Sequence, residues 1–455
     1  MIIVAVFIIG YLAIAFEHSI RINKTASALL TGVICWTLLA LSSPTESLLS
    51  SAHFTEYISK MQIDLGEKIS ALSQQELFRG FVVGQLSDHL AKIAEILFFL
   101  MGAMTIVELI DSHQGFRIIT DRIRTRNPKI LLWVVCWITF FLSAILDNLT
   151  TSIVMVSLIR KLIPDKKMRM FFAGMIIIAA NAGGAWTPIG DVTTTMLWIG
   201  GQITTLNIMK VLILPSLVCM LAPLLYLNFT LKGTLGEIAA TRRKAEKAVG
   251  SRRMLILGIG ALISVPVFKT YTHLPPYVGM LAGLGVLWVM SELIHPELDE
   301  SEKKRYSAAG ALSRIDIPSV LFFLGILLAV AALESLQILD HFASYLATTI
   351  GDNRMIITLI GLLSAVVDNV PLVAASMGMY SLDVYPADHM IWQYLAYCAG
   401  TGGSILIIGS AAGVAVMGME KIDFMWYLRK ISLIALIGYL AGAATYLLLQ
   451  PILAH

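Results

Sequence analysis

The sequence predicts an all-α polytopic membrane protein, and three observations lead to that fold class. Of its 455 residues, 57% are hydrophobic and 14% are charged, whereas soluble domains carry about 25% charged residues. Apolar runs long enough to cross a bilayer, each needing about 20 residues, recur along the chain. Lys and Arg collect between these runs. These features exclude a soluble globular enzyme, and the formal net charge of +3 gives no reason to expect a nucleic-acid partner.

Twelve apolar segments follow one another along the chain. The first has no basic residue before it but Arg21 and Lys24 after it, so we expect a membrane helix with its N-terminus outside rather than a signal peptide. The four cysteines lie singly inside apolar stretches, which favours buried side chains over disulfides or a metal site. The segments are 1–16, 25–42, 93–110, 128–163, 168–199, 203–231, 254–268, 276–294, 318–340, 354–384, 389–419 and 431–450.

The basic residues determine the expected topology, because positively charged loops stay in the cytoplasm. Segment 128–163 has a basic cluster at each end, so a single crossing would put the two clusters on opposite sides. A re-entrant hairpin in 128–163, with a second one in 354–384, removes this conflict. We therefore expect ten full crossings and two hairpins, with both termini outside and a surface helix in the outer loop 43–92. The basic clusters are 111–130, 160–169, 232–253, 295–317 and 420–430.

The two halves of the sequence resemble each other. Leu-Phe-Phe-Leu at 97–100 recurs at 321–324, and Ser-Ala-Ile-Leu-Asp-Asn at 143–148 recurs as Ser-Ala-Val-Val-Asp-Asn at 364–369. Gly183-Gly184 before Gly190 is matched by Gly402-Gly403 before Gly409. Because the charges give the halves opposite orientations, we predict an inverted-topology repeat, which is typical of secondary transporters. The first repeat is 1–250, with hairpin 128–163 and broken helix 168–199; the second is 251–455, with hairpin 354–384 and broken helix 389–419.

Polar, helix-breaking stretches interrupt four of the apolar segments. They are the two hairpin tips, at 147–150 and 368–371, and two Gly-rich stretches, at 181–195 and 400–413. Breaks in lipid are tolerated only where protein or a water-filled cavity satisfies the backbone. An ionised Asp at the bilayer centre costs about 2.5–3.5 kcal/mol, so Asp147, Asp191 and Asp368 are expected to face a partner or cavity. Their carboxylates, together with nearby amide and hydroxyl oxygens, suit a hard cation such as Na⁺ or Li⁺.

The candidate cation and proton site combines the side-chain oxygens at these breaks. For each hydroxyl group, a bond to a backbone carbonyl or packing between helices is an equal alternative. Glu95 could belong to a proton pathway or be an ordinary interfacial acid, and Glu108 and Glu334 are expected to be interfacial acids. The site residues are Asp147, Asn148, Thr150, Asn181, Thr187, Asp191, Thr193, Thr194, Asp368, Asn369, Ser404 and Ser410, with Na⁺ bound at Asp147, Asp191 and Asp368.

These motifs resemble those of the NhaD-type sodium/proton antiporters, which belong to the ion transporter superfamily. The resemblance rests on the Asp-Asn hairpin tips, on Gly-Gly-x-x-Thr-Pro-Ile-Gly-Asp over 183–191, and on Glu17-His18 followed by Ile22-Asn23-Lys24-Thr25. It implies that the hairpin tips and the unwound stretches jointly form the cation site. Ser410 stands where the first break has Asp191, so the two half-sites differ chemically.

The expected function is secondary antiport, in which Na⁺ or Li⁺ leaves the cytoplasm in exchange for H⁺ by alternating access. The cation and the proton would compete for the shared carboxylates. The chain has no Walker-type Gly-x-x-x-x-Gly-Lys-Ser/Thr sequence, so neither ATP nor a cofactor is expected. We expect the protein to lie among lipids as a multi-pass protein of the bacterial inner membrane; a homodimer is an assembly that the sequence leaves open.

Two other functions are considered. A sodium-coupled dicarboxylate symporter, or an exporter of arsenite or another anion, could use the same scaffold, but the acidic tips disfavour an anionic substrate. An intramembrane aspartyl protease is disfavoured because the chain has Leu146-Asp147 and Pro188-Ile189-Gly190-Asp191 in place of Tyr-Asp and Gly-x-Gly-Asp. The chain is therefore expected to be a transporter and not an enzyme.

Overall fold

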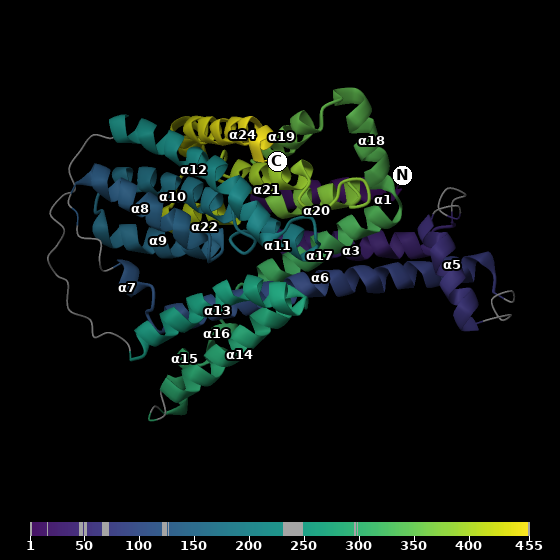
Figure 1. Ribbon diagram of the computed structural model, residues 1–455, viewed down its shortest axis with the longest axis horizontal. Helices are drawn as coiled ribbons and strands as arrows, with labels where there is room; N and C mark the ends of the chain where they lie inside the picture. The colour runs from purple at the N-terminus through teal and green to yellow at the C-terminus, as the bar shows by residue number, and fades with distance from the viewer. Residues whose placement is uncertain are drawn as a thin grey trace. The chain divides into compact units, whose positions relative to one another are not determined.

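Helices are the regular secondary structure of the described part of the chain. A computed structural model describes residues 2–15, 17–44, 49, 52–65, 72–120, 125, 127–230, 249–294, 297 and 299–453. Within these ranges every regular element is a helix and no β-strand occurs, so the predicted all-α class is confirmed (Figure 1). Among the described residues, eight helices are long and apolar enough to cross a membrane; α18 (Ile338–Ile350) and α19 (Asn353–Leu363) make a ninth if they count as one bent span.

The chain divides into two compact units. The first consists of Met1–Leu97, Ile317–Thr348 and Ala374–Tyr380. Its helices α3 and α17 approach closely, since a Cβ atom on Gly32 would lie 2.6 Å from the carbonyl oxygen of Gly325. Trp36 on α3 donates from Nε1 to the carbonyl of Leu328 on α17 at 2.8 Å. The unit contains α1 (Ile2–Ala15), α2 (Glu17–Ile20), α3 (Lys24–Leu41), α5 (Ala52–Leu65), the first part of α6 (Gln74–Ser112), α17 (Ile317–Ser335), most of α18 and the end of α20 (Asn369–Met379).

The loop 43–92 contains a helix, as predicted, together with a long extension of α6. The ring of Phe81 on α6 meets the rings of Phe54 and Tyr57 on α5, with centroids 5.3 and 5.6 Å away. The sequence predicted an apolar segment only at 93–110, whereas α6 begins at Gln74 and is 39 residues long. At 1.5 Å per residue it spans about 58 Å, nearly twice the roughly 30 Å hydrocarbon core, so it is much longer than a bilayer crossing requires.

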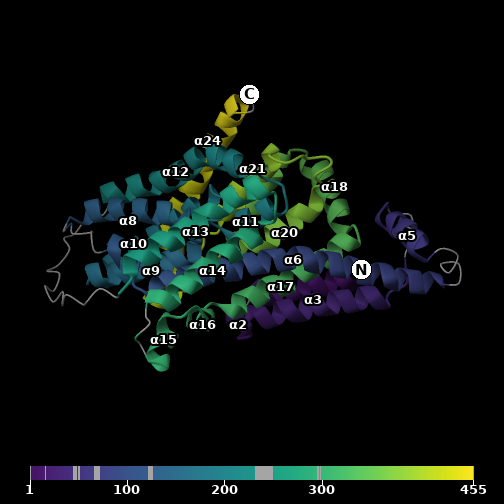
Figure 2. The same ribbon diagram turned by 60° about the horizontal axis from the view of Figure 1, so that its bottom comes forward.

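The second unit consists of Phe98–Asp316, Thr349–Val373 and Ser381–His455. In this unit α8, α9 and α10 lie side by side (Figures 1 and 2), α12 packs along α24, and α13 packs along α14. Its elements, besides the end of α6, α19 and the start of α20, are α7 (Arg117–Thr120), α8 (Pro128–Ser143), α9 (Asn148–Leu162), α10 (Lys166–Ala185), α11 (Val192–Ile199), α12 (Thr205–Thr230), α13 (Ser251–Thr272), α14 (Pro276–Ile294), α15 (Glu300–Tyr306), α16 (Ala308–Leu312), α21 (Met390–Gly402), α22 (Ala411–Glu420), α23 (Phe424–Tyr427), the π-helix η2 (Leu428–Ser432) and α24 (Leu433–Leu453).

Helices are interrupted near all four predicted breaks, although the two predicted tips, 147–150 and 368–371, are displaced: the interruptions are at 144–147 and 364–368. These lie between α8 and α9, α10 and α11, α19 and α20, and α21 and α22. The first Gly-rich break is shorter than the predicted stretch 181–195, because α10 stays helical to Ala185. Gly183 does not unwind the helix but allows close packing, since a Cβ atom there would collide with the backbone of Phe140 on α8.

The same packing contacts recur at matching positions of the two halves. Ser143 Oγ donates to the carbonyl of Ala180 at 2.7 Å, and Ser364 Oγ donates to the carbonyl of Ala399 at 3.0 Å. A Cβ atom on Gly402 would collide with the carbonyl of Gly361 on α19, as one on Gly183 would with Phe140. The helix before each Gly-rich break is thereby held against the helix before one of the other two breaks, α10 against α8 and α21 against α19.

Three features differ from the sequence-based expectations or lie beyond them. Helix α1 has 14 residues and spans about 21 Å, less than the hydrocarbon core. Helix α18 was not predicted because polar residues such as Asp340 and His341 interrupt its apolar pattern; it is bent by 113° from α19. Most of the basic segment 232–253 lies outside the described residues. All four cysteines are free and buried, as predicted.

Candidate cation site

Asp191 is placed by the start of α11. Its backbone is extended (φ −142°, ψ 147°), and its Oδ1 accepts from the backbone N–H of Thr193 at 3.1 Å. A short carboxylate at this N-cap position satisfies one of the free N–H groups of the helix. The turn before it is fixed by Thr195, whose Oγ1 donates to the carbonyl of Pro188 at 2.9 Å. Asp191 is 2% exposed, so its carboxyl group is buried.

Two asparagine amides from different halves of the chain meet at the other oxygen of Asp191. Oδ2 accepts from Nδ2 of Asn148, the first residue of α9, at 3.1 Å, and from Nδ2 of Asn369, the first residue of α20, at 3.5 Å. Asn148 Nδ2 also donates to Oδ1 of Asn181 on α10 at 3.0 Å. All three amides are buried. The starts of α9 and α20 and the break between α10 and α11 therefore converge on one carboxylate, within the second unit.

Asn181 connects this carboxylate to the break in the second half. Its Nδ2 donates to Ser404 Oγ at 2.9 Å and to Ser410 Oγ at 3.0 Å. Both serines are buried in the stretch between α21 and α22, where Ser410 is the N-cap of α22. The hydroxyl of Tyr427 donates to the carbonyl of Ser404 at 2.8 Å. No motif marks Tyr427 in the sequence, so sequence reasoning did not include it.

The other two predicted carboxylates have different surroundings. Asp147 is half-buried, and both of its oxygens are bonded to Thr150, Oδ1 to the backbone N–H at 2.7 Å and Oδ2 to the hydroxyl at 2.6 Å. Asp368 is half-buried and its Oδ1 accepts from the backbone N–H of Val370 at 3.3 Å. Both carboxylates lie near enough to Asp191 to repel its charge. Among the described residues, no group of three or more His, Cys, Asp and Glu side chains could hold a metal ion.

Four helices begin at this network. The first residue or N-cap of each, namely Asn148 of α9, Asp191 of α11, Asn369 of α20 and Ser410 of α22, belongs to it. The N-terminus of a helix carries a partial positive charge, which stabilises carboxylates. The site therefore balances buried negative charge with helix dipoles and amide donors. None of the hydrogen bonds described for the network comes from Lys or Arg.

Three of the predicted hydroxyl groups make no hydrogen bond to the side chains of the network among the contacts described. The buried hydroxyl of Thr193 lies beside the Asp191 carboxylate. Thr187 Oγ1 donates to the carbonyl of Ala144 at 2.7 Å, and Thr194 Oγ1 donates to the carbonyl of Asp191 at 2.9 Å. Thr187 and Thr194 therefore support the turn through the backbone, which is the alternative expected for hydroxyls at breaks.

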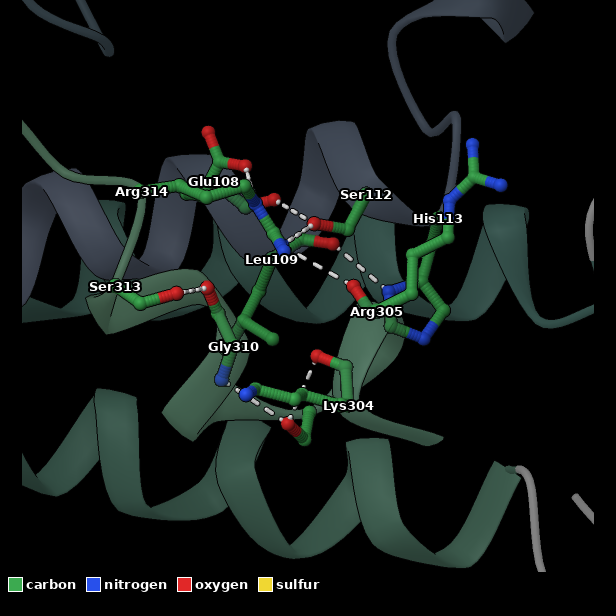
Figure 3. A network of polar contacts seen from close by, with 10 residues as sticks. Glu108, Leu109, Ser112, His113, Lys304, Arg305, Gly310, Ser313 and Arg314 are labelled. Atoms are coloured by element: carbon green, nitrogen blue, oxygen red, sulfur yellow. Dashed lines mark hydrogen bonds and ion pairs between the residues drawn. The ribbon is translucent and has the colours of Figure 1, made fainter. Parts of the chain in front are cut away.

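The predicted acids on α6 lie outside the network. Glu95 is half-buried, and the described contacts give it no hydrogen bond to the site. Glu108 pairs with Arg314, whose Nε lies 2.5 Å from Oε1, and the same guanidinium donates to Ser112 Oγ at 2.6 Å and to the carbonyl of Arg305 at 3.1 Å (Figure 3). This cluster fixes the segment of α15 and α16 against the end of α6.

A second buried carboxylate was not predicted. Glu420, the last residue of α22, has a side chain that is 0% exposed, and it pairs with Arg160 on α9 and Arg169 on α10. The sequence carries one signal for it: an acid at the edge of the basic segment 420–430, which the charge pattern places on the same side of the membrane as the basic cluster 160–169.

Comparison with known proteins identifies the family. A family model described as citrate transporter matches residues 11–396. Sodium/proton antiporter 2 of Arabidopsis thaliana is 45% identical over 443 residues, covering 96% of this chain and 97% of that protein. Sodium/proton antiporter 1 of the same plant is 50% identical over 441 residues, covering 96% and 70%. The Na⁺/H⁺ antiporter NhaD of Vibrio cholerae is 33% identical over 399 residues, covering 80% of each chain.

These relatives and the apolar helices establish a multi-pass membrane transporter, not an enzyme. Two of the relatives come from a plant, so they do not support the prediction of a bacterial inner membrane. The predicted resemblance is confirmed at the level of the family. The chain belongs to the NhaD-type sodium/proton antiporters, within the group of transporters that the citrate-transporter model describes.

Proposed function

We propose that this chain exchanges Na⁺ or Li⁺ for H⁺ at the Asp191 network. The observation that carries the proposal is the burial of the Asp191 carboxylate, with amides of Asn148 and Asn369 on one of its oxygens. Carboxylate, amide and hydroxyl oxygens are the ligands that hard cations prefer, and the Asp191 network contains all three kinds of group. The relatives named as sodium/proton antiporters support Na⁺ and H⁺ as the transported ions, with no cofactor required.

Competition for one carboxylate would couple the two ions. A deprotonated Asp191 attracts the cation, whereas a proton on the same oxygen removes both the charge and the lone pair that the cation needs. The neighbouring carboxylates Asp147 and Asp368 add negative charge, which strengthens the attraction for either ion. The cation and the proton therefore cannot occupy Asp191 together, and each is released when the other binds.

Alternating access on an inverted repeat is the transport mechanism that we propose. The paired contacts of Ser143 and Ser364, and of Gly183 and Gly402, support equivalent roles for the two halves. The sequence likeness and the opposite charge patterns of the halves support opposite orientations, with α8–α9 and α19–α20 as re-entrant hairpins and both termini outside. Asparagines from both hairpin tips then reach the same carboxylate, so movement of either tip alters the site.

A carboxylate symporter is the second candidate, because the matching family model is described as citrate transporter. Recognition of a dicarboxylate needs positive side chains or neutral donors aimed at the substrate. Here Asp147 and Asp368 both add negative charge around Asp191, which would repel an anion. The site therefore favours a cation as the transported species.

The test uses the purified chain in proteoliposomes with an internal pH-sensitive dye. A pulse of Na⁺ or Li⁺ should move protons in the opposite direction, and Asp191→Asn should abolish this movement while leaving membrane insertion intact. Asp423→Asn is a matched control, because Asp423 is exposed and caps α23 through the N–H of Trp426, a role that asparagine can keep. Counterflow of a labelled dicarboxylate in place of cation-dependent proton movement would support the symporter instead.

A further inference from the structure

One buried carboxylate joins the far ends of three helices that form the cation site. Glu420 Oε1 accepts from Arg160 Nε at 2.7 Å, and Oε2 accepts from Arg169 Nε at 2.6 Å. Its side chain is 0% exposed, whereas Arg160 and Arg169 are 45% and 18% exposed. A buried carboxylate is tolerated only when it is paired and hydrogen-bonded, so both arginines hold Glu420 in place.

Each residue of this triad lies on a helix that carries a site residue at its other end. Arg160 lies on α9, which begins at Asn148, and Glu420 ends α22, whose N-cap is Ser410. Arg169 lies near the start of α10, which carries Asn181. At 1.5 Å per residue the three separations along the helices are about 18, 15 and 18 Å. The triad is therefore remote from the candidate cation site. On each of the three helices, the triad residue lies at a similar distance from the site residue.

These three helices also pack against one another in pairs, α9 with α10, α9 with α22, and α10 with α22. Their site ends are joined by the bonds of Asn181 to Asn148 and to Ser410. Their other ends are joined by Glu420. Because helices α9 and α10 come from the first half of the chain and α22 from the second, the triad fixes the register between the two half-sites.

We infer that Glu420 is a positioning residue for the cation site and sets the affinity for Na⁺ through the spacing of α9, α10 and α22. The inference rests on the proposed function for the identity of the ion. Loss of the Glu420 charge weakens the contact of both arginines with α22, so the three helix ends shift and the hydrogen-bonded side chains of Asn148, Asn181 and Ser410 lose their alignment. Remote changes of this kind alter binding by about 2- to 30-fold.

The test compares Glu420→Gln with Asp423→Asn. Asp423 is the exposed N-cap of α23 and lies three residues after Glu420, so its replacement removes a nearby charge that is not part of the triad. Two readouts are measured on the purified full-length chain: the apparent Kd for Na⁺, from thermal unfolding in a Na⁺ titration at constant ionic strength, and the KM for Na⁺ in proteoliposomes. Glu420→Gln should raise both values about 2- to 30-fold, and Asp423→Asn should leave both unchanged. A Glu420→Gln protein with unaltered Kd and KM, and only a lower Tm or Vmax, would overturn the inference.

Two further variants keep the inference testable if Glu420→Gln does not fold. Arg160→Gln leaves the pair of Glu420 and Arg169 intact and should raise Kd by a smaller factor. The double exchange of Arg169→Glu with Glu420→Arg restores an ion pair between the two positions. Its Kd for Na⁺ should lie closer to that of the unaltered protein than the Kd of Glu420→Gln does. A folded double variant without this recovery would contradict the inference. If the unaltered chain binds Na⁺ but moves no protons, the proposed antiport fails, while the Kd values still decide the role of Glu420.

Discussion

The side chain of Asn181 donates a 2.9 Å hydrogen bond to the hydroxyl of Ser404, 223 residues further along the chain. The two residues belong to the two broken helical segments, α10–α11 and α21–α22, of different halves. Because both side chains are buried, their mutual bond replaces contacts that water would otherwise make. The cation site is thus a single network built from both halves rather than two independent half-sites.

Replacement of Asn181 should weaken Na⁺ binding without a charge change. In Asn181→Ala the hydroxyls of Ser404 and Ser410 lose a donor and Asn148 loses one of its two acceptors. Each buried polar group left without a partner costs about 1–3 kcal/mol, so we expect at least about a tenfold rise in the KM for Na⁺, since 1.4 kcal/mol is a factor of ten. The measurement is Na⁺-dependent proton movement in proteoliposomes. Asn353→Ala, which removes an amide bonded to the Tyr385 hydroxyl, should leave KM unchanged.

Asp147 and Asp191 should differ sharply when each is replaced by asparagine. Both residues are N-caps, and asparagine caps helices about as well as aspartate, so both variants are expected to fold. Asp191→Asn removes the buried charge at the centre of the network and should abolish exchange. Asp147→Asn keeps the cap bonded to Thr150 and removes only a nearby charge, so exchange should continue with a higher KM for Na⁺. Equal loss of activity in both variants, at equal amounts of inserted protein, would mean that the two carboxylates act as a pair.

The sequence could not separate these two aspartates, and the reason is tertiary burial. Each is an Asp at a helix break, and the likeness of the two halves pairs Asp147 with Asp368 rather than with Asp191. The positions of the breaks, by contrast, were predictable, because Gly, Pro and Asn interrupt apolar runs at those places. What decides the chemistry is that Asn148 and Asn369 approach Asp191 from helices far apart in sequence, and no local pattern encodes that approach.

Glu420 is a second residue whose contacts could not be predicted from the sequence. In the sequence it is one acid at the edge of a basic segment, which resembles an ordinary interfacial residue. Its role depends on Arg160 and Arg169 lying within hydrogen-bond distance after α9, α10 and α22 have packed together. The glycines were easier to interpret, since the pairing of Gly183 with Gly402 in the two halves indicated matching positions. Their use for close helix contact, rather than for unwinding, became evident only from the packing.

Alanine at the matched glycines should disrupt both halves alike. A Cβ atom on Gly183 would collide with the backbone of Phe140, and one on Gly402 with the carbonyl of Gly361, and backbone atoms cannot rotate away. Overpacking of this kind costs about 1–3 kcal/mol or more, so both variants should lower Tm and lose exchange. Gly418→Ala is the control: a Cβ atom there meets nothing within 4 Å, and alanine in a helix should stabilise the protein by about 0.5–1 kcal/mol. A Gly402→Ala protein as stable and active as the Gly418→Ala protein would show that α19 and α21 do not depend on this close contact.

Na⁺ should stabilise the purified protein, and protons should oppose that effect. A ligand that binds only the folded state adds about 2.7 kcal/mol at 100 times its Kd, so Tm should rise with Na⁺ concentration at alkaline pH. A protonated carboxylate does not attract the cation, so lowering the pH raises the apparent Kd and shrinks the Tm shift at a fixed Na⁺ concentration. The measurement is thermal unfolding across Na⁺ and pH, with choline replacing Na⁺ to hold the ionic strength constant.

Asp191→Asn should show no Na⁺-dependent shift in Tm at any pH. Its neutral amide does not attract the cation, so there is no bound cation for a proton to displace. A Na⁺-dependent shift of equal size at acidic and alkaline pH in the unaltered protein would exclude competition at a shared carboxylate, since a cation held only by amide and hydroxyl oxygens would be insensitive to the proton concentration.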